Sequence, residues 1–271
     1  MAKYDLAKKR AIVTGASGGF GREFAERFVK DYGCEVIGIG RNEEKLRALQ
    51  NALGGNFTYR VFDVGVKENW DNFARELRDT GFIPDILVNN AGFLLPFAKA
   101  EKHSPADAEE ITAVNYLSSV YSFSALLPLL SRSAAPAIVN VSSSAALAPV
   151  AGTALYSASK AALKSFTECL SMDYKGKIYV AGVYPGFTKT DIFRRQNKGA
   201  DNRLIEKLCA PADKAVKKIV KKLRRRKTRI VTGADAKAMG FFYRLFPSLT
   251  AKAIRGVLEK SKMEIFEDVF L

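Results

Sequence analysis

Short apolar segments alternate with longer amphipathic segments along most of the chain. The apolar segments have the length and composition of buried strands and cover residues 10–13, 35–40, 57–62, 85–88, 137–141 and 177–183. Between them lie segments with apolar positions at helical spacing, at 22–32, 43–51, 67–79, 105–130, 153–174 and 211–226. This alternation predicts an α/β fold in which a parallel sheet is doubly wound, with helices on both faces.

The chain has the organisation of one domain. Its 271 residues contain no internal repeat, low-complexity tract or long Gly/Ser linker, and doubly wound folds of this length are common. After the last predicted strand, helical patterns at 234–246 and 249–261 are joined at Pro247. We therefore predict a single domain over residues 1–271, with 234–271 as a C-terminal helical extension.

A glycine-rich turn follows the first predicted strand. Residues 14–21 read Thr-Gly-Ala-Ser-Gly-Gly-Phe-Gly, and the amphipathic segment 22–32 begins directly afterwards. Glycines allow a tight turn and close approach of the backbone to a pyrophosphate, which then lies on the N-terminus of the helix. A glycine cluster alone is weak evidence, but a strand, turn and helix in this order predict a dinucleotide-binding site.

The second predicted strand ends beside a cation. Arg41 follows Gly40, and no Asp or Glu occupies this position. A carboxylate there would hydrogen-bond a ribose diol and favour NAD(H), whereas a planar guanidinium suits a 2′-phosphate. We therefore predict NADP(H) as the preferred cofactor, with NAD(H) as the alternative. A second interpretation of Arg41 is a solvated residue that opens the next helix.

Tyr156 and Lys160 are spaced to share one face of a helix, and Ser143 lies upstream at the end of a predicted strand. A free tyrosine titrates near 10. A nearby ammonium favours the phenolate and moves its pKa toward the working range of an acid–base catalyst. The same spacing is also found where a surface Tyr has a Lys neighbour without any catalytic role, so the pair alone does not decide between the two interpretations. The motifs around the pair favour the catalytic interpretation.

These motifs, taken in order, resemble those of the short-chain dehydrogenase/reductase family, over about residues 8 to 190. The turn matches TGxxxGxG, and residues 156–160 match YxxxK. Residues 89–92 match NNAG, a stretch that in the family supports the central sheet and lines the cofactor. The resemblance, together with Arg41, implies cofactor contacts from Gly15, Ser17, Gly19, Phe20, Gly21, Arg41, Asp63, Val64, Asn89, Ala91, Gly92, Tyr156, Lys160, Pro185, Gly186, Thr188 and Thr190. One departure concerns Gly18, where NADP-preferring members often carry Lys or Arg.

The resemblance also implies a mechanism. Tyr156 exchanges a proton with the substrate oxygen, and Ser143 binds the same oxygen. Lys160 lowers the tyrosine pKa and binds the nicotinamide ribose, while Asn115 holds a water that relays protons. Carbonyl–alcohol interconversion by hydride transfer is the implied reaction. The alternative is a regulator or scaffold that kept the fold and lost turnover.

Positive charge is concentrated near the C-terminal third. The net charge is +15, and residues 214–229 contain ten Lys or Arg and no acid. Apolar residues interleave at helical spacing, so a solvated helix on the outer face of the sheet is one interpretation. The aromatic segment 239–247 follows this basic run. Because an apolar segment beside a basic one could lie at a bilayer surface, peripheral membrane contact is the second interpretation. Nucleic acid is not expected, because no recognised binding module is present.

Other residue types limit the class and location. The three cysteines and the single histidine, His103, have no metal-ligand spacing, so no metal is predicted. The glycine-rich turn begins too early for a preceding signal peptide, and no uncharged stretch of spanning length is found. A cytoplasmic enzyme, with peripheral membrane contact as an option, is the expectation.

Apolar residues after two strand ends indicate the substrate class. Phe93, Leu94, Leu95, Phe97, Leu147, Ala148, Pro149 and Val150 predict an apolar pocket wall. The loop 187–209 and the tail are expected to cover it, which favours a lipophilic carbonyl or alcohol, steroid-like or long-chain. In the resembling family the helices 105–130 and 153–174 form a two-fold interface, so a homodimer or homotetramer is implied.

Overall fold

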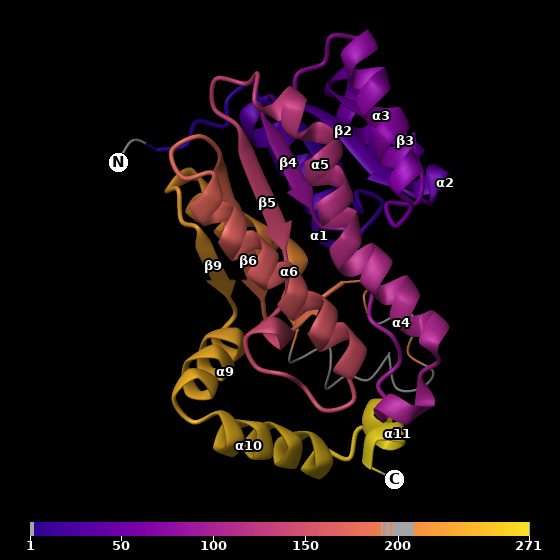
Figure 1. Ribbon diagram of the computed structural model, residues 1–271, viewed down its shortest axis with the longest axis vertical. Coiled ribbons are helices and arrows are strands. Elements are labelled where there is room, and N and C mark those ends of the chain that lie inside the picture. The colour runs from indigo at the N-terminus through magenta and orange to yellow at the C-terminus, as the bar shows by residue number, and fades with distance from the viewer. Residues whose placement is uncertain (1–2, 191, 193–195, 197–208, 271) are drawn as a thin grey trace.

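The computed structural model describes residues 3–190, 192, 196 and 209–270, and its centre is a seven-stranded parallel sheet (Figure 1). The strand order is β3-β2-β1-β4-β5-β6-β9. The strands are β1 (Arg10–Thr14), β2 (Glu35–Gly40), β3 (Phe57–Val61), β4 (Ile86–Asn89), β5 (Ala137–Val141), β6 (Tyr179–Pro185) and β9 (Arg229–Thr232). The order reverses beside β1, which confirms the predicted doubly wound fold.

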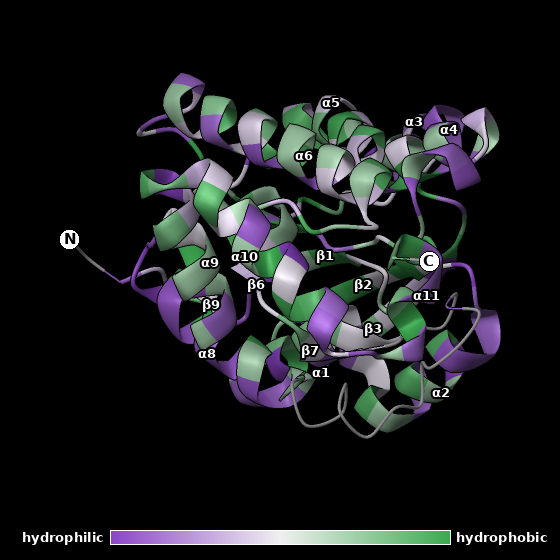
Figure 2. Cartoon of the chain, turned by 90° about the horizontal axis from the view of Figure 1, so that it is seen from below, coloured by the Kyte–Doolittle hydropathy of each residue, from purple (hydrophilic) through white to green (hydrophobic). Residues whose placement is uncertain are grey.

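Helices cover both faces of the sheet in three layers (Figure 2). One face carries α1 (Gly19–Tyr32), α2 (Glu43–Leu53) and α8 (Ala212–Arg224). The other carries α3 (Lys67–Asp79), α4 (Pro105–Thr112), α5 (Ser118–Leu130) and α6 (Ala154–Asp173). Two apolar clusters fill the spaces between the layers, one centred on Phe24, Phe28 and Val216 and the other on Trp70, Leu126 and Leu170.

Most element boundaries agree with the sequence-based prediction within two residues. The exception at a helix start is α1, which begins at Gly19, inside the glycine-rich turn, rather than at Arg22. Strand β9 was not predicted, because its four residues directly follow the basic run and give too short a pattern. It pairs in parallel with β6 and forms one edge of the sheet.

The helix run from Pro105 to Leu130 contains a π-helical segment, Ala113–Leu117, between α4 and α5. By length and composition alone this run is apolar enough to cross a membrane, although no such span was expected from the sequence. In the fold it lies against the sheet and buries Ile111, Leu126 and Leu130 completely. The π-helical segment places Asn115 near the carboxyl ends of the strands.

The C-terminal segment is helical, as predicted, and consists of α9 (Ala234–Leu245), α10 (Pro247–Lys260) and the short α11 (Glu267–Phe270). It passes below the carboxyl ends of the strands and returns toward α4 (Figure 1). A two-stranded parallel pair, β7 (Thr188–Lys189) with β8 (Ala210–Pro211), lies between β6 and α8. Most of the loop 187–209, predicted to cover the pocket, lies outside the described residues.

Candidate active site

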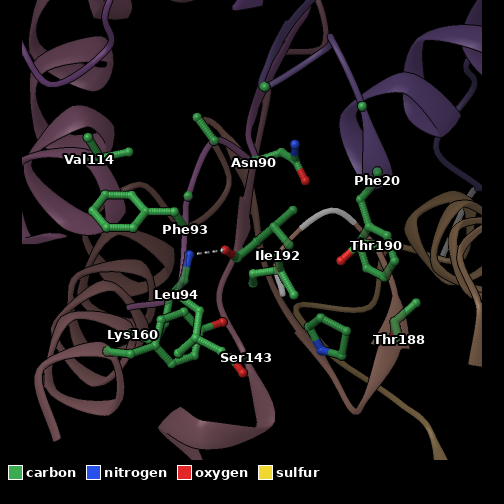
Figure 3. A pocket seen from close by; sticks show the side chains of 18 of the residues that line it. Phe20, Asn90, Phe93, Leu94, Val114, Ser143, Lys160, Thr188, Thr190 and Ile192 are labelled. Carbon is green, nitrogen blue, oxygen red and sulfur yellow. Dashed lines mark hydrogen bonds between the residues drawn. The ribbon is translucent and has the colours of Figure 1, made fainter. Parts of the chain in front are cut away.

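A cavity of about 670 Å³ opens at the carboxyl ends of the strands, where the sequence motifs converge. The predicted site residues that line it are Gly15, Ser17, Gly19, Phe20, Arg41, Asp63, Val64, Ala91, Gly92, Ser143, Tyr156, Lys160, Pro185, Gly186, Thr188 and Thr190. Figure 3 shows Ser143 and Lys160 with Phe93 and Leu94 in one part of the wall, and Phe20, Thr188 and Thr190 in another. Gly21, Asn89 and Asn115 do not line the cavity.

Hydrogen bonds from Thr14 fix the glycine-rich turn to the end of β4. The Thr14 hydroxyl oxygen accepts from the backbone N–H groups of Asn90 and Ala91 at 2.8 and 2.9 Å. The Asn90 amide donates back to the Thr14 carbonyl at 2.9 Å. Gly15 has φ +67, a backbone conformation that disfavours other residues. The turn is thus held rigidly at the point where the sheet order reverses.

Gly21 acts in packing rather than in lining the cavity. A Cβ at this position would collide with the carbonyl of Gly15, so only glycine lets the first turn of α1 lie against the strand end. The N-cap of α1 is Gly18, which has no side chain to bond the free N–H groups, and the first turn holds no acidic residue. These N–H groups and the helix dipole are suited to a pyrophosphate, so the residues present fit a dinucleotide.

A cationic rim lies at the end of β2. Arg41 lines the cavity and pairs with Asp63 at 3.4 Å (Nη1 to Oδ2), with both side chains partly exposed. Asn42 caps α2 by accepting a hydrogen bond from the backbone N–H of Lys45 at 2.8 Å. Asn42 and Lys45 also line the cavity, and neither was predicted. The sequence signal that could have identified Lys45 is its place in the first turn of the helix that follows Arg41.

The Tyr156 side chain is buried in the cavity wall and hydrogen-bonds Ser143. Burial raises the pKa of Tyr156, and the bond to Ser143 lowers it to a smaller extent. Ser143 precedes a short 3₁₀ turn, Ser144–Ala146, and its Oγ accepts from the backbone N–H of Ala145 at 3.1 Å. This turn orients the hydroxyl toward the tyrosine, so the two oxygens form one polar spot.

Lys160 is also buried, and burial lowers its pKa to about 8. Its Nζ donates to the carbonyl of Val141 at 3.2 Å and lies 6.0 Å from the centre of the Tyr156 ring. The sequence reasoning expected Lys160 to lower the tyrosine pKa. In this structure burial outweighs any such effect, because removal from water penalises the charged form of both groups. The phenol is therefore protonated near neutral pH.

Asn115 holds a loop rather than facing the cavity. Its Oδ1 accepts from the backbone N–H of Phe93 at 2.9 Å, and its Nδ2 donates to the Phe93 carbonyl at 2.9 Å. A further bond from Nδ2 reaches Ser159 Oγ at 3.2 Å. A Cβ on Gly92 would lie 3.0 Å from both Asn115 Oδ1 and Lys160 Nζ. Gly92 therefore allows the amide and the ammonium to lie close together.

Asn89 belongs to a buried hydrogen-bond chain between α5 and α6. Its Nδ2 donates to Asn140 Oδ1 at 2.9 Å, and its Oδ1 accepts from Ser122 at 2.8 Å. Asn140 continues the chain by donating to Thr167 at 2.9 Å. Each buried amide finds partners across β4 and β5, which tie the central strands to both helices. Asn89 thus supports the central sheet, one of the two roles that the family resemblance implies for this stretch.

The turn after β6 depends on the C-terminal extension. Asp235, in the first turn of α9, accepts a hydrogen bond at 2.7 Å from the backbone N–H of Phe187. A Cβ on Gly186 would collide with this carboxylate, so the turn and the helix are in close contact. Thr188 Oγ1 donates to the Gly186 carbonyl at 2.9 Å. Sequence reasoning missed Asp235, since nothing local links it to the turn.

An apolar wall borders the substrate end of the cavity. Phe93, Leu94, Phe97, Val150 and Ile192 line it, whereas the predicted Leu95, Leu147, Ala148 and Pro149 do not. Phe97 stacks edge-on against Phe266 of the extension, with ring centres 4.8 Å apart. Gln196 bonds the backbone of Phe97 and Leu95 at 3.0 and 3.1 Å. The wall therefore joins three segments distant in sequence.

The remaining candidates from the sequence lie elsewhere. His103 follows a short 3₁₀ turn on the surface, as predicted for a loop residue. Cys34, Cys169 and Cys209 are free thiols. Among residues 3–190, 192, 196 and 209–270, no group of three or more His, Cys, Asp or Glu is placed to hold a metal.

Comparison with known proteins identifies the class. The family model for short chain dehydrogenase matches residues 9–201, so the chain belongs to the short-chain dehydrogenase family and is an oxidoreductase. The glycine-rich turn and the NNAG stretch lie at strand ends described above, and Tyr156 and Lys160 lie on α6.

Particular relatives share most of the chain. The NADP-dependent 3-hydroxy acid dehydrogenase YdfG of Salmonella typhi is 34% identical over 198 residues, which cover 71% of this chain and 78% of that protein. The 3-oxoacyl-[acyl-carrier-protein] reductase FabG of Rickettsia prowazekii is 32% identical, with 75% and 83% covered. The closed form of serine dehydrogenase complexed with NADP+ has a TM-score of 0.74 and 29% identity, with 82% and 94% covered.

Proposed function

We propose that the protein is an NADP(H)-dependent oxidoreductase that interconverts a carbonyl and a secondary alcohol on a lipophilic substrate. The observation that carries the proposal is one cavity with two different ends. A buried Tyr156 hydroxyl bonded to Ser143 lies at one end, and Arg41 lies on the rim at the other. A dinucleotide on the glycine-rich turn would join them.

The preference for NADP(H) rests on the cations at the end of β2. Arg41 and Lys45 both line the cavity there. Position 41 holds no Asp or Glu, the residue type that would favour NAD(H). A guanidinium and an ammonium favour a 2′-phosphate. Two of the relatives described above carry NADP in their names or bound state. Gly18 departs from the pattern of NADP-preferring members, so NAD(H) is retained as the weaker ligand.

The chemistry assigns one role to each polar group. A nicotinamide bound in the cavity supplies or accepts the hydride. Tyr156 gives the substrate oxygen a proton during reduction and removes it during oxidation, while Ser143 hydrogen-bonds the same oxygen. Lys160 holds the nicotinamide ribose. Asn115 keeps the loop at Phe93 in place and takes part in proton relay through water.

The protonation states suit the role of Tyr156 as the proton donor in carbonyl reduction. Because burial raises the pKa of Tyr156, the phenol carries its proton at neutral pH and acts as an acid. Burial also lowers the pKa of Lys160 to about 8, so this group is largely protonated at pH 7. A proton donor and a hydrogen-bonding serine suit a carbonyl that becomes an alkoxide as hydride arrives.

The apolar wall favours a long-chain ketone or ketoacyl substrate, or one like a steroid. Phe93, Leu94, Phe97 and Val150 present carbon surface beside the tyrosine, and the extension adds Phe266 behind Phe97. The names of the relatives mention hydroxy acids, serine and oxoacyl groups. A long-chain β-ketoacyl substrate has a carbonyl of the kind that those names imply, and its alkyl tail would fit against the apolar wall of this cavity.

A substrate panel followed by NADPH absorbance tests the proposal. Long-chain β-ketoacyl esters and lipophilic ketones should be reduced faster than small keto acids at the same concentration. Tyr156→Phe should lower turnover about 10²- to 10⁴-fold, the range for loss of a positioned acid, and leave NADPH binding nearly unchanged. Near-wild-type turnover by Tyr156→Phe on an identified substrate would overturn the mechanism. The alternative of a silent scaffold requires that the whole panel stay unreacted.

A homodimer or homotetramer through α5 and α6 completes the proposal. Tyr116, Phe123, Phe166 and Tyr174 form edge-on ring contacts on this face, with centres 5.6 to 6.1 Å apart, and all are partly exposed. A partner related by two-fold symmetry would bury them. Light scattering should give at least twice the mass of the chain, and Phe166→Glu should shift it toward one chain. A single-chain mass for the wild type at micromolar concentration would reject the interface.

We also propose a cytoplasmic location for the protein.

A further inference from the structure

A basic pocket lies away from the cavity described above, between the outer side of α8 and the start of α9. Lys218, Lys221, Lys222, Arg225 and Lys237 line a hollow of about 470 Å³, and no acidic residue lines it. The Lys222 ammonium donates to the Val231 carbonyl at 2.7 Å. Burial lowers the pKa of Lys222, and repulsion from Lys237 and Lys218 lowers it further. The positive charges of this pocket are thus held close together without carboxylates among its lining residues.

An exposed apolar ridge begins one helical turn away. Nine large apolar side chains are exposed in the described part of the chain, and five of them fall between residues 241 and 249: Phe241, Phe242, Leu245, Phe246 and Leu249. Their exposed fractions run from 52% to 67%. Exposed apolar residues scattered singly are ordinary, but a concentrated group marks an interaction surface.

The basic pocket and the apolar ridge share one helix face. Lys237 and Phe241 are four residues apart on α9, and Leu245 follows at the same spacing, so the three side chains form one stripe. Figure 2 shows α9 beside α8 and α10. The surface thus passes from lysines to phenylalanines without a break.

The fold itself does not use the ridge. The inner side of the two helices is formed by Ala236, Met239, Thr250 and Leu258, which are buried or packed on the core. The exposed phenylalanines lie on the opposite side, where the rings of Phe241 and Phe242 contact each other with centres 5.5 Å apart. A pocket lid would require these rings to face the cavity, and none of them lines it.

We propose that this surface docks on the headgroup region of an anionic phospholipid bilayer. The lysines and Arg225 would neutralise lipid phosphates, while the rings of the ridge enter the interface. Charge complementarity selects an anionic bilayer over a neutral one, because apolar rings alone would suit both. The inner side of α9 contacts the site through Asp235 and Phe187, so docking would place the bilayer beside the cavity. The proposal does not depend on the reaction proposed above.

Flotation of the full chain with vesicles tests this proposal without any substrate. Phosphatidylcholine vesicles are compared with vesicles that also contain phosphatidylglycerol, each at low and high salt. We expect binding only to the anionic vesicles, with a decrease at high salt because exposed charges are screened. Each basic residue at such a surface contributes about fivefold, so Lys218→Gln/Lys221→Gln should weaken binding about 25-fold.

Matched variants separate this surface from general stickiness. Phe241→Ser/Phe242→Ser should weaken binding and remove the part that resists salt, whereas the exposed Met172→Ser on α6 should leave it unchanged. Lys175→Gln/Lys177→Gln removes the same charge from another exposed site and should also have no effect. No flotation with anionic vesicles at low salt, or equal loss in both charge variants, would overturn the proposal. A ridge-dependent change in mass by light scattering, without vesicle binding, would assign the ridge to a second copy and overturn it as well.

Discussion

The carboxylate of Asp235 holds the backbone N–H of Phe187 at 2.7 Å, across 48 positions of sequence. Asp235 opens α9, and Phe187 belongs to the turn after β6 that lines the cavity. The C-terminal extension is therefore part of the support of the site. Its removal should affect the site even though none of its described residues lines the cavity.

We expect Asp235→Ala to weaken cofactor binding by about tenfold or more. Loss of a hydrogen bond to a charged group costs about 1.5–3 kcal/mol, and the turn would lose the contact that orders Phe187. Asp235→Asn keeps an acceptor oxygen and should restore most of the affinity. Fluorescence titration with NADPH measures both variants, and thermal unfolding serves as the control for stability. Equal affinity in wild type and Asp235→Ala would show that the turn is held by other contacts.

The cationic rim leads to a prediction about cofactor selectivity. Arg41→Ala should weaken NADPH binding by about 10- to 100-fold, the effect expected for a lost charge-assisted contact, and leave NADH binding nearly unchanged. Lys45→Ala should add to this loss, because the two side chains line the same part of the cavity. Titration of both cofactors against wild type and variants provides the measurement. Equal or tighter binding of NADH by the wild type would contradict the assignment.

Sequence periodicity predicted the order of the elements because nearly every helix and strand buries a regular apolar pattern. The trio Ser143, Tyr156 and Lys160 was predictable for a related reason, since each residue lies in a local motif at a strand end or on one helix. Such motifs do not carry information about partners far away. Asp235 and Phe266 reach the site from the extension, and no local pattern connects them to β6 or to Phe97.

Burial was the second quantity that the sequence could not supply. Spacing indicated that Lys160 would lower the pKa of Tyr156, but it did not indicate that both groups leave water in the folded chain. Asn89 illustrates the same limit: its motif implied support of the central sheet but could not name the partners, Asn140 and Ser122, that its buried side chain bonds. The edge strand β9 was too short for a recognisable period.

Burial of the Lys160 ammonium should lower the stability of the folded chain, although the same group is needed for turnover. Its folded pKa of about 8 lies below the 10.5 of a lysine in water, so the unfolded chain binds more protons between these values. Below pH 8 the folded state therefore bears a penalty of roughly 3 kcal/mol, which fades as the pH rises toward 10.5. Lys160→Met should be more stable than wild type at pH 7 and should lose turnover.

Urea unfolding at two pH values checks this prediction. The stability of Lys160→Met relative to wild type should be greatest near pH 7 and should fall by roughly 3 kcal/mol as the pH rises above 10.5, because the wild-type lysine is then neutral in both states. Lys164→Met, at a partly buried pair with Glu168 on the same helix, is the control and should not reproduce this change between the two pH values. A gain that is equal at both pH values would mean that the ammonium is not the source of the penalty.

The contact between Phe97 and Phe266 predicts how the extension sets substrate size. Phe97 lines the cavity, and Phe266 supports it from behind with ring centres 4.8 Å apart. Phe266→Ala removes that support, so Phe97 can move back and the cavity gains room at its apolar end. Stability should fall by about 3–5 kcal/mol, the range for truncation of a buried Phe. Among substrates that differ only in chain bulk, kcat/KM for bulkier members should rise relative to smaller ones. Phe266→Leu should give an intermediate ratio with a smaller stability loss, and an unchanged ratio in both variants would assign Phe266 to folding alone.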